Sequence, residues 1–174
     1  MSAQLTARPD RTEYPPYFEG YVSLVPDGDV LDTLSRQIDD TLALVERADP
    51  AWGDHRYAPE KWSVKEVFGH MIDSERVFNY RVLCFARGDR TPLPGFDQDD
   101  YMRLANFSDR ALADLAAEFA QVRRTTLLLF RGLDDAAWPR RGVANNNEAT
   151  VRAMAYIIAG HERHHVQVLR TKYL

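Results

Sequence analysis

Three of the chain's five histidines lie close together, at His161, His164 and His165. His161 and His165 are four positions apart, so on a helix both imidazoles project from one face. Two imidazoles one turn apart can bind a single divalent ion. His164 points about a quarter turn away from that face. We therefore expect His161 and His165 to be metal ligands, and His164 to be the weakest ligand candidate of the three.

The alternative for this pair is a packing role without metal. A single histidine on an apolar helix face usually has its hydrogen bonds satisfied within the core. The favourable interaction of a histidine with the helix dipole near the C-terminus could account for His165 alone. Two adjacent imidazoles are harder to satisfy, because each unpaired buried ring nitrogen costs about 1–3 kcal/mol. One divalent ion would satisfy both rings, so metal binding is the favoured interpretation.

A third ligand must come from earlier in the chain. Catalytic metal sites usually have three protein ligands and one open position, and the sequence ends soon after His165. His70 is the candidate, because it lies at the edge of the apolar face of a predicted helix, beside Val67 and Val77. If that helix packs against the helix that carries His161, the three imidazoles complete a metal site.

Residues 161–165 also read His-Glu-x-x-His, the signature of zinc proteases, in which the glutamate is the general base. No third ligand follows, and no strand is predicted that would bind a peptide, so a peptidase is disfavoured. Glu162 remains a weak candidate for a catalytic base. A carboxylate that packs in the core or supports a ligand is at least as good an interpretation.

Two other residues have structural interpretations. Glu75 falls on an apolar helix face, where an unpaired charge is unfavourable. We expect it to form an ion pair with one of the nearby arginines, and the alternative is a hydrogen bond to a ligating histidine. Cys84 has no basic neighbour that would activate its thiol, so we expect it to be an inert core residue. The acidic residues 97–101 lack the glycine and final glutamate of a calcium loop. We expect them to serve as a helix cap and a solvated loop.

Four stretches with helical periodicity must position these residues, and no stretch of useful length alternates as a half-buried strand does. Ser63 and Glu66 form a capping box at the start of the second stretch. Asp29, Ser108 and Thr150 are the expected caps of the other three. The predicted helices cover residues 29–47, 63–88, 108–132 and 150 to nearly 174.

The connection between the second and third helices is long and rich in proline, glycine and aspartate, from residue 89 to residue 107. A crossover that runs the length of a bundle explains such a segment better than an undirected loop. We therefore predict an all-α four-helix bundle, formed by a single domain over residues 1–174 with an extended N-terminal arm over residues 1–26.

Composition excludes several classes of protein. The formal charge of −4 and the pI near 5.7 argue against a nucleic-acid-binding module. No apolar run approaches the roughly 18 residues of a membrane span, and the N-terminus lacks the apolar core of a secretory signal. A single cysteine cannot form an internal disulfide, so a reducing cytoplasm is the expected location.

Three motifs together resemble a known family. They are residues 61–66 leading into Gly69 and His70, residues 92–97 (Pro-Leu-Pro-Gly-Phe-Asp), and residues 160–165. In this combination and order they resemble the DinB-like superfamily, which includes the YfiT-like metal-dependent hydrolases. The resemblance extends from about Tyr14 to Leu174.

The resemblance implies a four-helix bundle with up-down-down-up topology and a divalent metal, often nickel or zinc, held by His70, His161 and His165. Similar proteins with known activity include thiol S-transferases that use bacillithiol and an isomerase that uses mycothiol. Homodimers are common among them. A fold of this kind does not by itself identify the substrate.

These observations favour a metal-dependent enzyme that acts on a small molecule, either a hydrolase or a thiol-dependent S-transferase. In both, the metal would lower the pKa of a bound water or of a low-molecular-weight thiol. The alternative is a non-catalytic binding module, stabilised by metal or associated with stress, in which His164 or His55 closes the site as a fourth ligand. We expect neither nucleic acid nor membrane as a partner, whereas a homodimer fits the resemblance.

Overall fold

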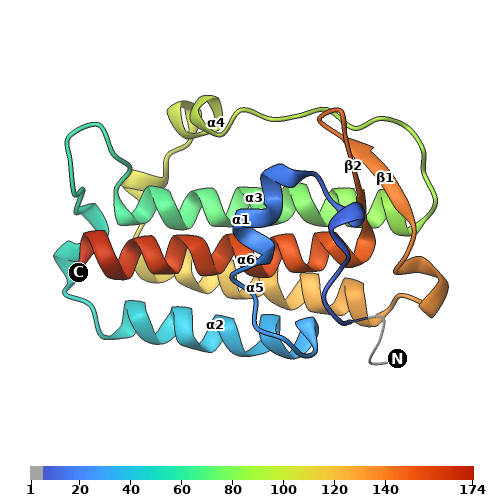
Figure 1. Cartoon of the computed structure of the whole chain (residues 1–174). Coiled ribbons are helices and arrows are strands. Elements are labelled where there is room, and N and C mark those ends of the chain that lie inside the picture. The colour runs from blue at the N-terminus through green and yellow to red at the C-terminus, as the bar shows by residue number, and fades with distance from the viewer. Residues whose placement is uncertain (1–5) are drawn as a thin grey trace.

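Four long helices pack side by side in the computed structural model, which describes residues 6–174 (Figure 1). α2 and α6 run in one direction and α3 and α5 in the other, which is the up-down-down-up arrangement that the resemblance implied. α3 packs against α5 and α6, and α2 packs against the same two helices. The predicted all-α bundle is confirmed. Its helices are α2 (Val30–Glu46), α3 (Val64–Ala86), α5 (Leu112–Arg131) and α6 (Val151–Val168).

The helix starts follow the caps in the sequence. The Asp29 carboxylate accepts from two backbone amides of the first turn of α2, and the Ser63 and Glu66 side chains form the expected capping box at the start of α3. The Thr150 hydroxyl accepts from the Ala153 amide and starts α6. Near its end, α6 widens into a π-helical turn over Leu169–Tyr173.

The predicted start of α5 is wrong. Ser108 lies in a 3₁₀ turn over Phe107–Asp109, and α5 begins after Ala111. Phe107 is buried against α3, at a point where a Cβ on Gly69 would lie 2.2 Å from the Phe107 ring. This contact fixes the chain before the helix, so α5 starts later than its capping signal indicated.

A short β-hairpin between α5 and α6 was missed by the sequence analysis. β1 (Arg141–Ala144) pairs antiparallel with β2 (Asn147–Thr150), and the turn residues Asn145 and Asn146 have φ values of 50° and 59°. Asparagine tolerates this left-handed backbone, which two-residue hairpin turns require. Strands of four residues are too short to show clear alternation. The hairpin packs across one end of the bundle, where Gly142 fits against Phe85 of α3.

The long connection between α3 and α5 runs back along the outside of the bundle, as a crossover must (Figure 1). It pairs with the hairpin through backbone bonds from Leu93 to Val143 and from Asn145 to Leu93, at 2.9 and 3.0 Å. The expected solvated loop at residues 97–101 is in part a helix, α4 (Gln98–Leu104), which Asp97 caps. The capping role predicted for this acidic segment is thus confirmed.

The N-terminal arm packs on α6 and is not uniformly extended. It contains two 3₁₀ turns, Arg11–Glu13 and Pro16–Phe18, followed by the short helix α1 (Glu19–Val22). The first five residues of the predicted arm lie outside the described part of the chain. Within that part, no helix is long and apolar enough to cross a membrane.

The core consists of two hydrophobic clusters, one toward each end of the bundle. On α2 the division falls between Leu34 and Ile38, and on α3 it falls between Ile72 and Phe78. Buried polar and charged residues from all four helices occupy the level between the clusters. They are Gln37, Thr41, His70, Ser74, Glu75, Arg123, Thr126, His161 and Glu162.

Candidate metal centre

His70 of α3 meets His161 and His165 of α6 inside the bundle, because these two helices are antiparallel neighbours. His70 Nε2 lies 3.0 Å from His161 Nε2, and His165 Nε2 lies 3.2 Å from the same atom. His70 and His161 are buried and His165 is partly buried. The structure therefore brings together the three residues that the sequence analysis named.

The two distances from His161 Nε2 are close to those expected between ligands of one divalent metal. Two imidazole nitrogens bound at about 2.0–2.1 Å in a tetrahedral site lie about 3.3 Å apart. His161 Nε2 carries either one hydrogen or one lone pair, so it cannot make a well-directed hydrogen bond to both neighbouring nitrogens. One cation between the three nitrogens would satisfy all of them.

Burial keeps these imidazoles in the form that binds metal. Desolvation, with a smaller contribution from His164, lowers the pKa of His70 from 6.5 to about 4. Desolvation and the neighbouring histidines also hold the pKa of His161 and of His165 well below the usual value. All three rings are therefore neutral at neutral pH, and a neutral ring nitrogen can donate its lone pair.

Ser74 orients the ring of His70 from one turn further along α3. Its Oγ lies 3.4 Å from His70 Nδ1, so a hydrogen on Nδ1 would leave the Nε2 lone pair free for a metal. The Trp62 ring, 4.9 Å from the His70 ring, packs beside it. The four-residue spacing of His70 and Ser74 was visible in the sequence, but its meaning depended on which ring nitrogen faces the cluster.

The two candidate fourth ligands do not join the cluster. His164 packs against the rings of Tyr21 and His165, with centroids 5.4 and 5.0 Å apart, but its nitrogens are not part of the ligand group. His55 is exposed and lies beside Tyr173. Among the described residues, the group that could hold a metal consists of His70, His161 and His165. The donor set is the three-histidine set of catalytic sites rather than the closed set of structural sites.

A cavity of about 220 Å³ reaches His70 and His161. Its walls come from the N-terminal arm, α3, the crossover and the hairpin turn, which meet over the histidines. Tyr21 of α1 packs edge-on against His161, at 5.5 Å between centroids. The wall residues of the N-terminal arm, the crossover and the hairpin turn were not predicted, since segments without periodicity do not reveal where they fold back. The lining residues are Tyr17, Phe18, Tyr21, His70, Ser74, Phe78, Arg81, Phe96, Gln98, Asn145 and His161.

Comparison with known proteins shows the family of the chain and a solved structure of similar fold. The sequence profile of the DinB superfamily matches residues 33–169, a span that includes all three histidines. The chain belongs to the DinB superfamily. No curated protein matches it. The chain is similar to the solved structure of YfiT from Bacillus subtilis, described as a probable metal-dependent hydrolase with an unusual four-helix bundle topology. The match has a TM-score of 0.66 and 16% sequence identity, and it covers 96% of this chain and 97% of YfiT.

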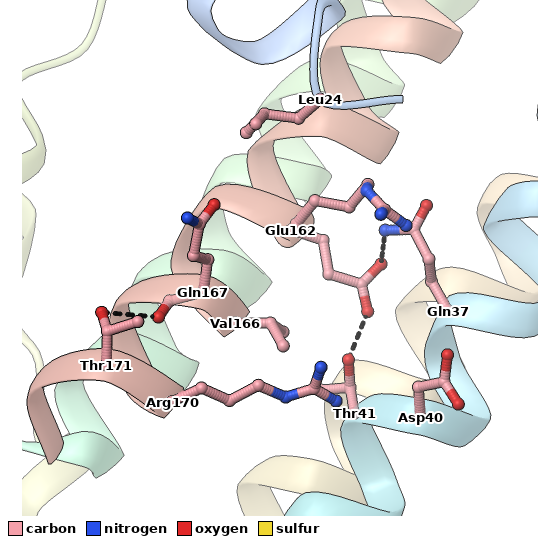
Figure 2. Close-up of a pocket in the computed structure, with 10 residues that line it drawn as sticks. Leu24, Gln37, Asp40, Thr41, Glu162, Val166, Gln167, Arg170 and Thr171 are labelled. Atoms are coloured by element: carbon pink, nitrogen blue, oxygen red, sulfur yellow. Dashed lines mark hydrogen bonds between the residues drawn. The ribbon is translucent and has the colours of Figure 1, made fainter. Parts of the chain in front are cut away.

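In this DinB-superfamily chain, Glu162 points toward α2 and lines a different cavity (Figure 2). Its Oε1 accepts from the Thr41 hydroxyl at 2.7 Å, and its Oε2 accepts from Gln37 and Arg123 at 3.0 and 2.6 Å. This second cavity, of about 330 Å³, is lined by none of the three histidines. The position of Glu162 supports its interpretation as a buried structural carboxylate.

Glu75 forms the ion pair that the sequence analysis favoured. Both of its oxygens accept from Arg123 at 2.8 Å, and Oε1 also accepts from the Thr126 hydroxyl at 2.6 Å. Arg123 thus lies between Glu75 and Glu162. Burial disfavours its charge, but the two carboxylates raise its pKa above the usual value. The positive charge of Arg123 is among the smaller causes that lower the pKa of His161.

Proposed function

We propose that this chain is a metal-dependent enzyme that holds a divalent cation, zinc or nickel, on His70, His161 and His165 and acts on a small molecule. The observation that carries the proposal is the convergence of three neutral imidazoles, two of which, His70 and His161, line a cavity. YfiT, whose fold the chain shares, is described as a probable metal-dependent hydrolase, which is consistent with a metal-dependent enzyme here.

The cavity determines what such a site could accept. Its volume of about 220 Å³ suits a small molecule, and the aromatic residues Tyr17, Phe18 and Phe96 form part of its wall. A bound cation would supply Lewis acidity and lower the pKa of a coordinated water or thiol. The protein residues hold the imidazoles neutral, place the Ser74 hydroxyl 3.4 Å from His70 Nδ1, and limit the volume open to water and substrate.

Hydrolysis and thiol transfer are distinguished by assaying the metal-loaded protein in two ways. p-Nitrophenyl acetate reports hydrolysis in water alone, and monochlorobimane with a low-molecular-weight thiol reports transfer. We expect turnover above that of the free metal in one of these assays, and its loss in His161→Gln. Glu162→Gln is the matched variant and should retain turnover, because Glu162 lines another cavity. Absence of turnover from a panel of esters and thiol acceptors would contradict an enzymatic role.

The competing proposal is a non-catalytic module in which metal stabilises the bundle. It requires a fourth protein ligand, since structural sites are closed. His55 lies beside Tyr173, and His164 packs beside His165 at 5.0 Å between ring centroids without joining the group of ligand atoms. This arrangement favours the enzyme. A thiol cosubstrate, a homodimer and a cytoplasmic location remain predictions.

A further inference from the structure

Arg81 is a buried arginine on the face of α3 that carries His70. The two residues are eleven positions apart, which is close to three full turns, so their side chains leave the helix in nearly the same direction. Only 7% of Arg81 is exposed. Side chains on a helix lean toward its N-terminus, which brings the guanidinium back toward His70.

The charge of Arg81 has no acidic partner among the described residues. Its Nη2 donates to the Pro94 carbonyl at 3.1 Å, and its guanidinium lies 5.9 and 5.8 Å from the ring centroids of Phe78 and Phe96. Burial lowers its pKa. Arg123, in contrast, is paired with two carboxylates. Buried charges are normally paired, so a guanidinium held only by a carbonyl and two rings is unusual.

Arg81 lies where two cavities meet. The cavity over the histidines and a neighbouring cavity of about 300 Å³ share Arg81, Tyr17, Phe18 and Asn145 in their walls. No aspartate or glutamate of the described chain lines either of them. The second cavity is otherwise mostly apolar, with walls formed by Pro15, Phe85, Ala144, Asn147, Ala149 and Met154. A ligand could therefore reach Arg81 and the histidines together.

The crossover motif at residues 92–97 forms the outer wall around Arg81. Pro94 accepts its hydrogen bond, and Phe96 lies against the guanidinium. Gly95 allows the chain to approach the hairpin turn, since a Cβ there would lie 2.5 Å from Asn145 Oδ1. The motif contributes no ligand to the metal site. Its role in the structure is to hold Arg81 in place.

We propose that Arg81 binds an oxyanionic group, a carboxylate or a phosphate, of the small molecule whose reactive end lies at the histidines. The planar guanidinium fork matches both groups, and its Nε and Nη1 have no protein partner within the described chain. The inference rests on the proposed function, because it names the substrate class of the same site.

The test measures binding of phenylacetate, phenyl phosphate and the neutral phenylacetamide by calorimetry. We expect the better of the two anions to bind at least about tenfold more tightly than the amide, equivalent to about 1.4 kcal/mol. Arg81→Met should remove this preference and leave amide binding unchanged. Arg87→Gln is the matched control, because it replaces an exposed arginine at the C-terminal end of α3. This variant should behave as the wild type does. Whichever anion binds more tightly identifies the group.

The same titrations in His161→Gln separate this inference from the metal proposal. An anion preference that persists there and disappears in Arg81→Met supports the subsite, whether or not the protein binds metal. A preference that persists in Arg81→Met but disappears in His161→Gln places the anion on the metal and overturns the subsite. Should Arg81→Met fail to fold, the wild-type comparison still decides, since equal binding of anion and amide contradicts the proposal.

Discussion

At the level of single residues, the site depends on imidazole rings that remain neutral while buried. His70 and His161 are each almost fully buried, and their ring nitrogens face one another instead of solvent. The same burial that prepares them to bind metal makes them unfavourable places for a proton. Their contribution to stability therefore depends on pH in a way that can be measured without metal.

The metal-free protein should lose stability as the pH falls from about 6.5 toward 4. His70 has a folded-state pKa of about 4 against an ordinary value of 6.5, so in this range the unfolded chain binds more protons than the folded one. Each fully shifted histidine then contributes a slope of about 1.4 kcal/mol per pH unit. Urea denaturation at a series of pH values measures this slope. His70→Gln should show a smaller slope over this window, and an unchanged slope would contradict the assignment.

The sequence was sufficient to pair His161 with His165, because a four-residue spacing on a helix is a local property, whereas the choice of His70 depended on which helices pack together. It could not decide the role of Glu162, which shares the His-Glu-x-x-His motif but points toward α2. It also did not place Tyr21 and Arg81 at the site. Tyr21 lies on a short helix that has no periodic pattern, and the significance of Arg81 depends on which carboxylates are near it in space.

At the level of elements, the site requires α3 and α6 to be adjacent and the N-terminal arm to lie over them. The capping signals predicted the starts of α2, α3 and α6, since a cap involves only neighbouring residues. The hairpin and the start of α5 escaped prediction because their positions depend on contacts with α3, at Phe85 and Gly69. The closest approach of the arm to α6 is likewise made at a glycine, Gly160.

Gly160→Ala should displace the arm from α6. A Cβ at residue 160 would lie 2.1 Å from the backbone oxygen of Tyr21, so α1 must move. We expect a loss of about 1–3 kcal/mol in unfolding free energy and weaker substrate binding, with metal binding retained. Gly20→Ala is the matched control, because nothing lies within 4 Å of its Cβ. Equal stability of the two variants would show that the arm does not depend on this contact.

At the level of the whole molecule, a buried polar layer separates two hydrophobic clusters and connects all four helices. Arg123 of α5 contacts Glu75 of α3, Glu162 of α6 and the Leu34 carbonyl of α2. Periodicity predicted the four helices of the bundle. It did not predict which of the arginines would lie in the buried polar layer, since that depends on how far each helix is shifted along the bundle axis relative to the others.

Arg123→Met should be strongly destabilising. Removing the guanidinium leaves two buried carboxylates unpaired, a change that typically costs 3–5 kcal/mol. Lowering the pH toward 5 should recover part of this loss, since protonated carboxyls need no counter-charge. Chemical denaturation of the variant and the wild type at both pH values measures the effect. Arg124→Met, which removes an exposed arginine, should have little effect, and similar losses in the two variants would contradict the account.

The most direct test of the account is the metal content of the purified protein after reconstitution with zinc or nickel and removal of loosely bound ions. The account predicts about one equivalent per chain. His70→Gln and His161→Gln should each lose it, whereas His164→Gln should keep it, because His164 lies outside the cluster. A wild-type protein that retains no metal, or a His161→Gln variant that retains as much as the wild type, would contradict the central claim.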